Sequence, residues 1–236
     1  MQSRAGVSAL EPVAPELVAA QIAAARASGQ VRAVKVGALA NGAVVRAVAV
    51  SLADADAPIV VDPVLAASGG FVLLDDDGRR ALVSDLLPRA ALVTPNLAEA
   101  AALVGARVTN RAEMRDAAHA LVAEVGAAAV LVKGGHLAGD APADLFVARG
   151  GGEHWLIAPR IAGVDLHGTG CALSSAVAAG LARGDELLAA IHAAREYVRE
   201  LLEHGSALPG AGRALADHLA PMRARTLRGD RDDGIG

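Results

Sequence analysis

Residues 165–171 read Asp165-Leu166-His167-Gly168-Thr169-Gly170-Cys171, a glycine-rich loop that leads into an apolar helix expected over residues 172–182. The first backbone N–H groups of a helix have no partner within the helix, the helix dipole makes that end positive, and glycines let an anion approach closely. Gly168, Thr169 and Gly170 are therefore candidate phosphate-binding residues. Glycine-rich junctions are also common without any ligand, so the function depends on the segments that accompany this loop.

Three other segments each combine a short apolar run with a polar or charged group at its end. They are Val61-Asp62-Pro63-Val64, Thr94-Pro95-Asn96-Leu97-Ala98-Glu99 and Val130-Leu131-Val132-Lys133-Gly134-Gly135-His136. In an α/β enzyme, ligands bind beyond the carboxyl ends of parallel strands. We therefore expect the side chains at these three ends to face one cleft, together with the loop at 168–171.

Strands and helices alternate along the chain. Short strands are expected at residues 33–36, 58–61, 91–93 and 129–132, and a hairpin is expected from 145–148 and 154–157. Helices are expected at 14–28, 42–52, 79–86, from Asn96 onward, and at 114–124, 170–183 and 185–205. This order predicts an α/β fold with a mostly parallel central sheet and helices on both faces. We expect a single domain over residues 1–220 and a disordered polar tail over 221–236.

Composition excludes several classes of protein. The chain has 236 residues, of which 53% are hydrophobic, and it contains no apolar run long enough to span a bilayer. No export signal is evident near its start, so a cytoplasmic protein is expected. A single cysteine allows no internal disulfide, and the histidines show no zinc-protease spacing. A net charge of −4 and 2% aromatic residues argue against nucleic-acid binding and favour a small-molecule partner.

The candidate cleft contains the groups that phosphoryl transfer requires, namely a cation near the transferred group and a base near the attacking hydroxyl. Lys133 either contacts phosphate oxygens or caps the sheet edge as an exposed lysine. Asp62 either holds Mg²⁺, directly or through water, or begins a turn as part of an Asp-Pro pair.

The remaining candidates also have two interpretations each. Asn96 and Glu99 have the spacing of a helix capping box, which is compatible with a role of Glu99 near a hydrated Mg²⁺. Cys171 lies where a helix dipole lowers the pKa of a thiol, and it is either a base or a small buried residue. His136 and His167 either line the cleft or form structural hydrogen bonds.

Together, the segments 61–64, 94–100, 132–136 and 167–171 resemble the hydroxymethylpyrimidine and phosphomethylpyrimidine kinases of thiamine biosynthesis, over about residues 12–207. The resemblance implies a ribokinase-like, three-layer α/β/α fold. It also implies ATP-dependent phosphorylation of 4-amino-5-hydroxymethyl-2-methylpyrimidine and then of its monophosphate, in the cytoplasm. Homodimers are usual in that family, and a homodimer is the partner expected besides ATP and the pyrimidine.

By the same resemblance, Cys171 is the base, and Gly168, Thr169 and Gly170 form the anion hole. Lys133 stabilises the transferred phosphate, while Asp62, Asn96 and Glu99 organise Mg²⁺ and ATP. Gly37, Ala38 and Cys171 contact the pyrimidine.

The sequence also departs from the family pattern. Ala38 stands where relatives often have methionine, and the strand and glycine-rich turn that open the relatives precede the region matched here. We therefore expect an N-terminally truncated domain, either a piece of a longer protein or a truncated paralogue. A pyridoxal or pyridoxine kinase and a catalytically impaired nucleotide-binding paralogue are the competing functions.

Overall fold

The structure, a computed structural model, describes residues 2–3, 6–67, 69–135, 137, 142–159, 161, 166–204 and 214–215. The tail expected at 221–236 lies outside the described residues, as do residues 205–213 and 216–220. None of the helices in the described ranges is long and apolar enough to cross a membrane.

A six-stranded sheet forms the centre of the fold, and its strands follow one another in chain order. They are β3 (Val34–Val36), β4 (Ile59–Val61), β5 (Leu92–Val93), β6 (Ala129–Val132), β7 (Ala143–Ala148) and β8 (Gly152–Ile157). The pairs from β3 to β6 are parallel, and β7 and β8 extend the sheet as an antiparallel hairpin. The α/β class and the mostly parallel sheet are confirmed.

Two smaller strand pairs lie outside this sheet. Strands β1 (Gln2–Ser3) and β2 (Gly6–Val7) pair antiparallel, and β9 (Leu166–His167) pairs parallel with β10 (Ala214–Leu215).

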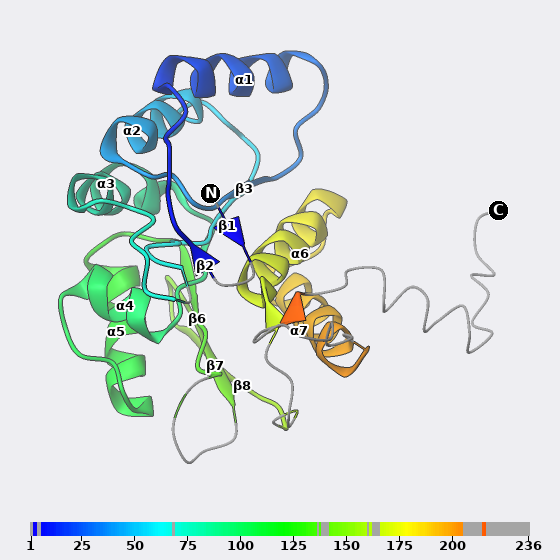
Figure 1. Cartoon of the computed structure of the whole chain (residues 1–236). Coiled ribbons are helices and arrows are strands. Elements are labelled where there is room, and N and C mark those ends of the chain that lie inside the picture. The colour runs from blue at the N-terminus through cyan, green and yellow to red at the C-terminus, as the bar shows by residue number, and fades with distance from the viewer. Residues whose placement is uncertain are drawn as a thin grey trace.

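Helices cover both faces of the sheet. The first group comprises α1 (Pro15–Ala27), α2 (Gly42–Ser51), α3 (Asp76–Ala81), α4 (Leu97–Val104) and α5 (Arg111–Ala123), and the second comprises α6 (Thr169–Arg183) and α7 (Leu187–His204). A π-helical segment, η1 (Leu82–Leu86), and a 3₁₀ turn, η2 (Leu87–Arg89), continue α3 toward β5. Figure 1 shows α2 to α5 on one side of the strands and α6 and α7 on the other. The three-layer architecture follows.

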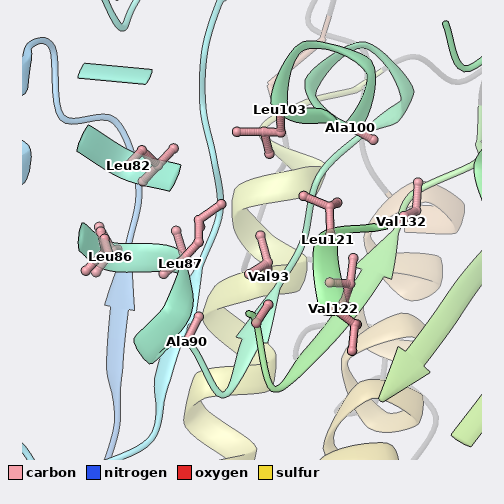
Figure 2. Close-up of a cluster of buried hydrophobic side chains, with 14 of the residues drawn as sticks. Leu82, Leu86, Leu87, Ala90, Val93, Ala100, Leu103, Leu121, Val122 and Val132 are labelled. Carbon is pink, nitrogen blue, oxygen red and sulfur yellow. The ribbon is translucent and has the colours of Figure 1, made fainter. Parts of the chain in front are cut away.

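Each face of the sheet has its own hydrophobic core. The larger core joins α2 to α5 with one set of strand side chains, and Figure 2 shows part of it, including Leu87 of η2, Val93 of β5 and Leu121 of α5 near the centre of the view. The smaller core joins the opposite strand face to α6 and α7 through residues such as Val60 and Ile191. Burial of this apolar surface on both faces fixes the sheet between its helix layers.

Candidate active site

Four neighbouring strands carry polar side chains on the face that is covered by α6. These residues are Lys35 in β3, Asp62 after β4, Thr94 after β5 and Lys133 after β6. Successive side chains of a strand point to opposite faces. Asp62, Thr94 and Lys133 come two positions after Val60, Leu92 and Leu131, which belong to the smaller core, and Lys35 pairs in register with Val60. The parallel strands therefore bring all four side chains under α6 at one edge of the sheet.

Asp62 is the centre of this cluster and is 2% exposed. Its Oδ1 lies 3.0 Å from the Lys133 ammonium and accepts a hydrogen bond of 3.2 Å from the Thr94 hydroxyl. The Ser174 hydroxyl lies 3.4 Å from Asp62 Oδ2 and 3.1 Å from the Cys171 carbonyl oxygen. A buried carboxylate requires such compensation, and the pairing fixes where the Lys133 charge lies. The turn expected from Asp62 is present as well, since Val64 N–H donates to the Asp62 carbonyl at 2.8 Å.

The start of α6 lies directly beside Lys133. Gly168 is the N-cap residue with φ 89°, a left-handed conformation that favours glycine, and it has no side chain to cap the helix. A Cβ at Gly170 would lie 3.0 Å from Lys133 Nζ. The structure therefore brings Gly168, Thr169 and Gly170 together with Lys133. The Lys133 side chain is 16% exposed, so the alternative of an exposed lysine at the sheet edge is wrong.

Asn96 and Glu99 form the capping box that their spacing predicts. The Asn96 side chain accepts from Glu99 N–H at 2.9 Å, and Glu99 Oε2 accepts from Asn96 N–H at 2.7 Å. Lys133 N–H donates to the Pro95 carbonyl at 2.8 Å, which ties this helix start to the end of β6. Burial raises the pKa of Glu99, the Lys133 ammonium and the Asn96 N–H lower it, and Asp62 raises it again. The charges of Lys133 and Asp62 therefore both affect the pKa of Glu99.

Cys171 lies in the first turn of α6 and is exposed, so the alternative of a buried small residue is wrong. Although the residue is exposed, surrounding protein atoms partly desolvate its thiol and raise the thiol's pKa, as does the Asp62 carboxylate, while the ammonium groups of Lys35 and Lys133 lower it. The net shift is upward, so the lowered pKa expected from the helix dipole is wrong. The effects of desolvation and of Asp62 exceed the attraction of the two cations.

Gly37 and Ala38, the residues expected to contact the acceptor, follow the end of β3. A Cβ at Gly37 would lie 2.8 Å from Lys35 Nζ, while Ala38 is exposed. Both residues lie at the same edge of the sheet as Asp62, because β3 pairs in parallel with β4. His136 lies outside the described residues, and the side chain of His167 is not described.

Sequence reasoning missed three polar residues of this cluster: Lys35, Thr94 and Ser174. Lys35 carries a signal, since a charged residue inside an otherwise apolar strand is unusual. Ser174 comes three residues after Cys171, so one helical turn places both near the same strand ends. Thr94 follows its strand as Asp62 does, but the sequence gives no sign that the Thr94 hydroxyl donates a hydrogen bond to Asp62.

Asp62 and Glu99 are the candidate Mg²⁺ ligands. In the described part of the chain, no group of three or more His, Cys, Asp or Glu residues is arranged to hold a metal ion. Magnesium in nucleotide sites is bound through one or two carboxylates, waters and the substrate phosphates. Asp62 beside α6 and Glu99 in the first turn of α4 supply two carboxylates for that donor set.

Comparison with known proteins identifies close relatives. A family model described as phosphomethylpyrimidine kinase matches residues 1–214. The hydroxymethylpyrimidine/phosphomethylpyrimidine kinase of Streptomyces coelicolor is 44% identical over 217 residues, which cover 92% of this chain and 79% of the relative. The crystal structure of phosphomethylpyrimidine kinase from Clostridium difficile matches with a TM-score of 0.73 and 29% identity, covering 84% of this chain and 81% of that one. Pyridoxal kinase from Staphylococcus aureus in complex with ADP matches with a TM-score of 0.82 and 28% identity, covering 93% and 79%.

Proposed function

Since the chain belongs to the phosphomethylpyrimidine kinase family, we propose that Lys133, Cys171 and the start of α6 carry out its phosphoryl transfer. The protein is a phosphotransferase, a hydroxymethylpyrimidine/phosphomethylpyrimidine kinase of thiamine biosynthesis. ATP donates the phosphoryl group first to the hydroxymethyl group of the pyrimidine and then to the resulting monophosphate.

The observation that supports these roles is the position of Lys133, held by Asp62 against the start of α6. Phosphoryl transfer needs charge compensation on the equatorial oxygens of the transferred group and little covalent chemistry. The first N–H groups of α6, which have no partner within the helix, and the Lys133 ammonium supply positive charge from two directions. We place the γ-phosphate of ATP between them.

Cys171 is the proposed base for the alcohol. The O–H bond of the hydroxymethyl group breaks, its proton passes to the Cys171 thiolate, and the oxygen forms a bond to the γ-phosphorus while ADP leaves. Because burial and Asp62 raise the pKa of this thiol, the thiolate fraction increases with pH throughout the neutral range. A monophosphate acceptor has already lost its protons above about pH 6, so its transfer needs this base less.

Asp62 and Glu99 are the proposed ligands of Mg²⁺, with Asn96 contacting the nucleotide. When bound, the metal ion neutralises charge on the β- and γ-phosphates. Asp62 presents Oδ2 beside α6, while Oδ1 is engaged by Lys133. Asn96 places the Glu99 carboxylate through the capping box.

ADP release by the purified chain tests the function. Mg-ATP is supplied with hydroxymethylpyrimidine, its monophosphate or pyridoxal in parallel assays, and we expect stimulation by both pyrimidines. Pyridoxal is included because the fold is also similar to pyridoxal kinases at TM-scores up to 0.82. Stimulation by pyridoxal alone would contradict the pyrimidine assignment. ATP binding without ADP release for any acceptor would indicate a catalytically impaired paralogue.

The Cys171→Ala variant tests the role of the base. We expect turnover of the alcohol to fall about 100-fold or more, and turnover of the monophosphate to fall much less. In the wild type, the rate with the alcohol should rise with pH from neutral toward the raised pKa of Cys171. An equal loss for both acceptors would exclude Cys171 as a base specific to the alcohol.

A further inference from the structure

Lysine is rare in this chain, and both lysines lie in the active site. Of the 22 Lys and Arg residues, only Lys35 and Lys133 are lysines. Lysine offers a compact point charge with three donors, whereas arginine offers a planar fork. Lys133 has a role in the proposed transfer, whereas that transfer assigns no role to Lys35.

The Lys35 side chain extends toward the acceptor side of the site. Lys35 pairs in register with Val60, which packs in the smaller core with Leu173 of α6, so the Lys35 side chain starts on the face under α6. Its ammonium reaches the carboxyl end of β3, where a Cβ at Gly37 would lie 2.8 Å away. β3 lies on one side of β4, while β6, which Lys133 directly follows, lies on the other side beyond β5. Asp62 at the end of β4 is therefore flanked by both lysines.

The charge of Lys35 is uncompensated within the described residues. The Lys133 ammonium is 3.0 Å from Asp62, whereas none of the ion pairs or side-chain hydrogen bonds among the described residues includes the Lys35 ammonium. Lys35 is nevertheless half-buried. A cation that is partly removed from water without a carboxylate partner is favoured by an anion supplied from outside the protein.

The second reaction of this enzyme brings such an anion to the acceptor side. An oxygen of the acceptor monophosphate forms a bond to the γ-phosphorus of ATP, the bond from that phosphorus to the β-phosphate oxygen breaks, and ADP leaves. Two anionic groups must approach each other in this step, while in the first reaction the acceptor is a neutral alcohol. Lys133 is already paired with Asp62 and lies at the donor side.

We propose that Lys35 determines acceptance of the monophosphate, by binding its phosphate group beside Gly37 and Cys171. The Lys35 ammonium also lowers the pKa of the Cys171 thiol, which agrees with a position of Lys35 on the same side of the site as Cys171. The inference rests on the proposed function, since it assigns the residue that admits the second acceptor to the same site.

Kinetics with both acceptors test the proposal. The variants are Lys35→Met, which keeps the length and removes the charge, and Lys35→Arg, which keeps the charge. Loss of one charge-assisted hydrogen bond raises KM for the monophosphate about 10- to 100-fold in Lys35→Met. The fall in kcat/KM for the alcohol is much smaller and comes from the higher pKa of the Cys171 thiol without the Lys35 ammonium. Lys35→Arg recovers part of the loss. Arg32→Met, an exposed change of equal charge before the same strand, is the control and leaves both acceptors unchanged.

A binding measurement keeps this inference separate from the proposed function. Reductive ¹³C-methylation of a chain with two lysines gives two lysine signals in a carbon-correlated NMR spectrum, and the Lys35→Arg variant assigns them. The monophosphate shifts the Lys35 signal and the alcohol does not. If the wild type phosphorylates neither pyrimidine, the proposed function fails, but this titration still decides the role of Lys35.

The opposite results are equally clear. Equal losses with both acceptors in Lys35→Met would assign Lys35 to Cys171 or to the shared transition state and overturn the proposal. Unchanged KM for the monophosphate, or a Lys35 signal that the monophosphate does not move, would overturn it as well.

Discussion

Gly168 and Gly170 both begin α6, but the structure requires glycine at the two positions for different reasons. Gly168 has φ 89°, while Gly170 is helical and faces Lys133 at 3.0 Å from its hypothetical Cβ. Gly168→Ala should lower the free energy of unfolding by about 1 kcal/mol through backbone strain. Gly170→Ala should leave stability near wild type, because alanine suits a helix, and should lower kcat about 10-fold by displacing Lys133 from Asp62. Urea denaturation and steady-state kinetics of both variants measure these effects.

The two variants serve as controls for each other. A stable Gly170→Ala protein with unchanged kcat would mean that Lys133 tolerates displacement and that its position is not critical. A fall in stability for Gly170→Ala equal to that of Gly168→Ala would mean that packing at the helix start, rather than Lys133, requires the glycine.

Glu99 should make stability depend on pH in a defined direction. Burial is the main cause that raises its pKa in the folded protein. Its stabilising contribution is therefore present below the pKa of the unfolded chain and is lost as pH rises through the folded pKa. Glu99→Gln retains an oxygen for the Asn96 N–H and cannot ionise, so the variant should gain stability relative to wild type between about pH 4 and pH 7. Urea denaturation of both proteins at several pH values gives the difference, and a difference independent of pH would contradict this account.

The positions of single residues in the site were predicted correctly where they follow from the order of strands in the chain alone. Asp62 and Lys133 follow buried strands, and parallel strands bring their ends together, so their proximity was predictable. Their 3.0 Å contact was not, because it depends on side-chain conformations across β5. The net pKa shift of Cys171 was also beyond a sequence argument, since burial and the Asp62 charge are tertiary effects.

At the scale of secondary structure, one ion pair joins α7, β7 and the loop that follows β6. Asp144 Oδ1 accepts from Gly134 N–H at 3.1 Å, and its Oδ2 lies 2.9 Å from Arg195 Nε. The Asp144 and Arg195 side chains are 18% and 16% exposed. We expect Asp144→Ala and Arg195→Ala each to lower stability by about 1–3 kcal/mol. Only Asp144→Ala should also lower kcat several-fold, because it releases Gly134 beside Lys133.

Denaturation and kinetics of the two single variants and the double variant measure this coupling. A coupling energy of about 1–3 kcal/mol is expected for groups in contact. Independent losses that simply add would show that the two residues act separately. Equal kcat in both single variants would remove the argument that Asp144 positions the loop.

The elements were predicted well where local signals are strong. The helix expected at 42–52 is Gly42–Ser51, and the strand at 129–132 is Ala129–Val132. The helix expected at 114–124 begins at Arg111, because the Asn110 side chain caps it by accepting from Glu113 N–H at 3.0 Å, a signal that apolar periodicity does not contain. The π-helical segment at Leu82–Leu86 was expected only as part of an ordinary helix, since hydrogen bonds that span five residues instead of four leave no distinct sequence pattern.

At the scale of the whole molecule, the order of strands explains why the site residues converge. Each parallel strand pairs with its predecessor in the chain, so the polar residues that end β4, β5 and β6 collect at one edge. The sequence predicted this edge, because alternation of strands and helices implies parallel pairing. It did not predict which face of the sheet α6 covers, and that face decides that Lys35 and Ser174 belong to the site.

The two hydrophobic cores share one sheet, and we propose that residues 1–220 form one domain that unfolds as a unit. Leu121 of α5 lies in the larger core and Ile191 of α7 in the smaller one, and both are fully buried. Each substitution to alanine should lower stability by about 2–5 kcal/mol. Since the sites lie on opposite faces of the sheet, the losses should add in the double variant.

Urea unfolding followed by far-UV circular dichroism and by fluorescence of Trp155, the single tryptophan, tests this cooperativity. Trp155 lies on β8 and packs against the larger core, whereas circular dichroism reports α6 and α7 together with the other helices. If the chain is one unit, Ile191→Ala shifts both signals to the same lower midpoint, although Ile191 belongs to the smaller core. A fluorescence transition that stays at the wild-type midpoint while circular dichroism shows an earlier phase would mean that α6 and α7 unfold separately. The site between α6 and the strand ends would then open without loss of the larger core.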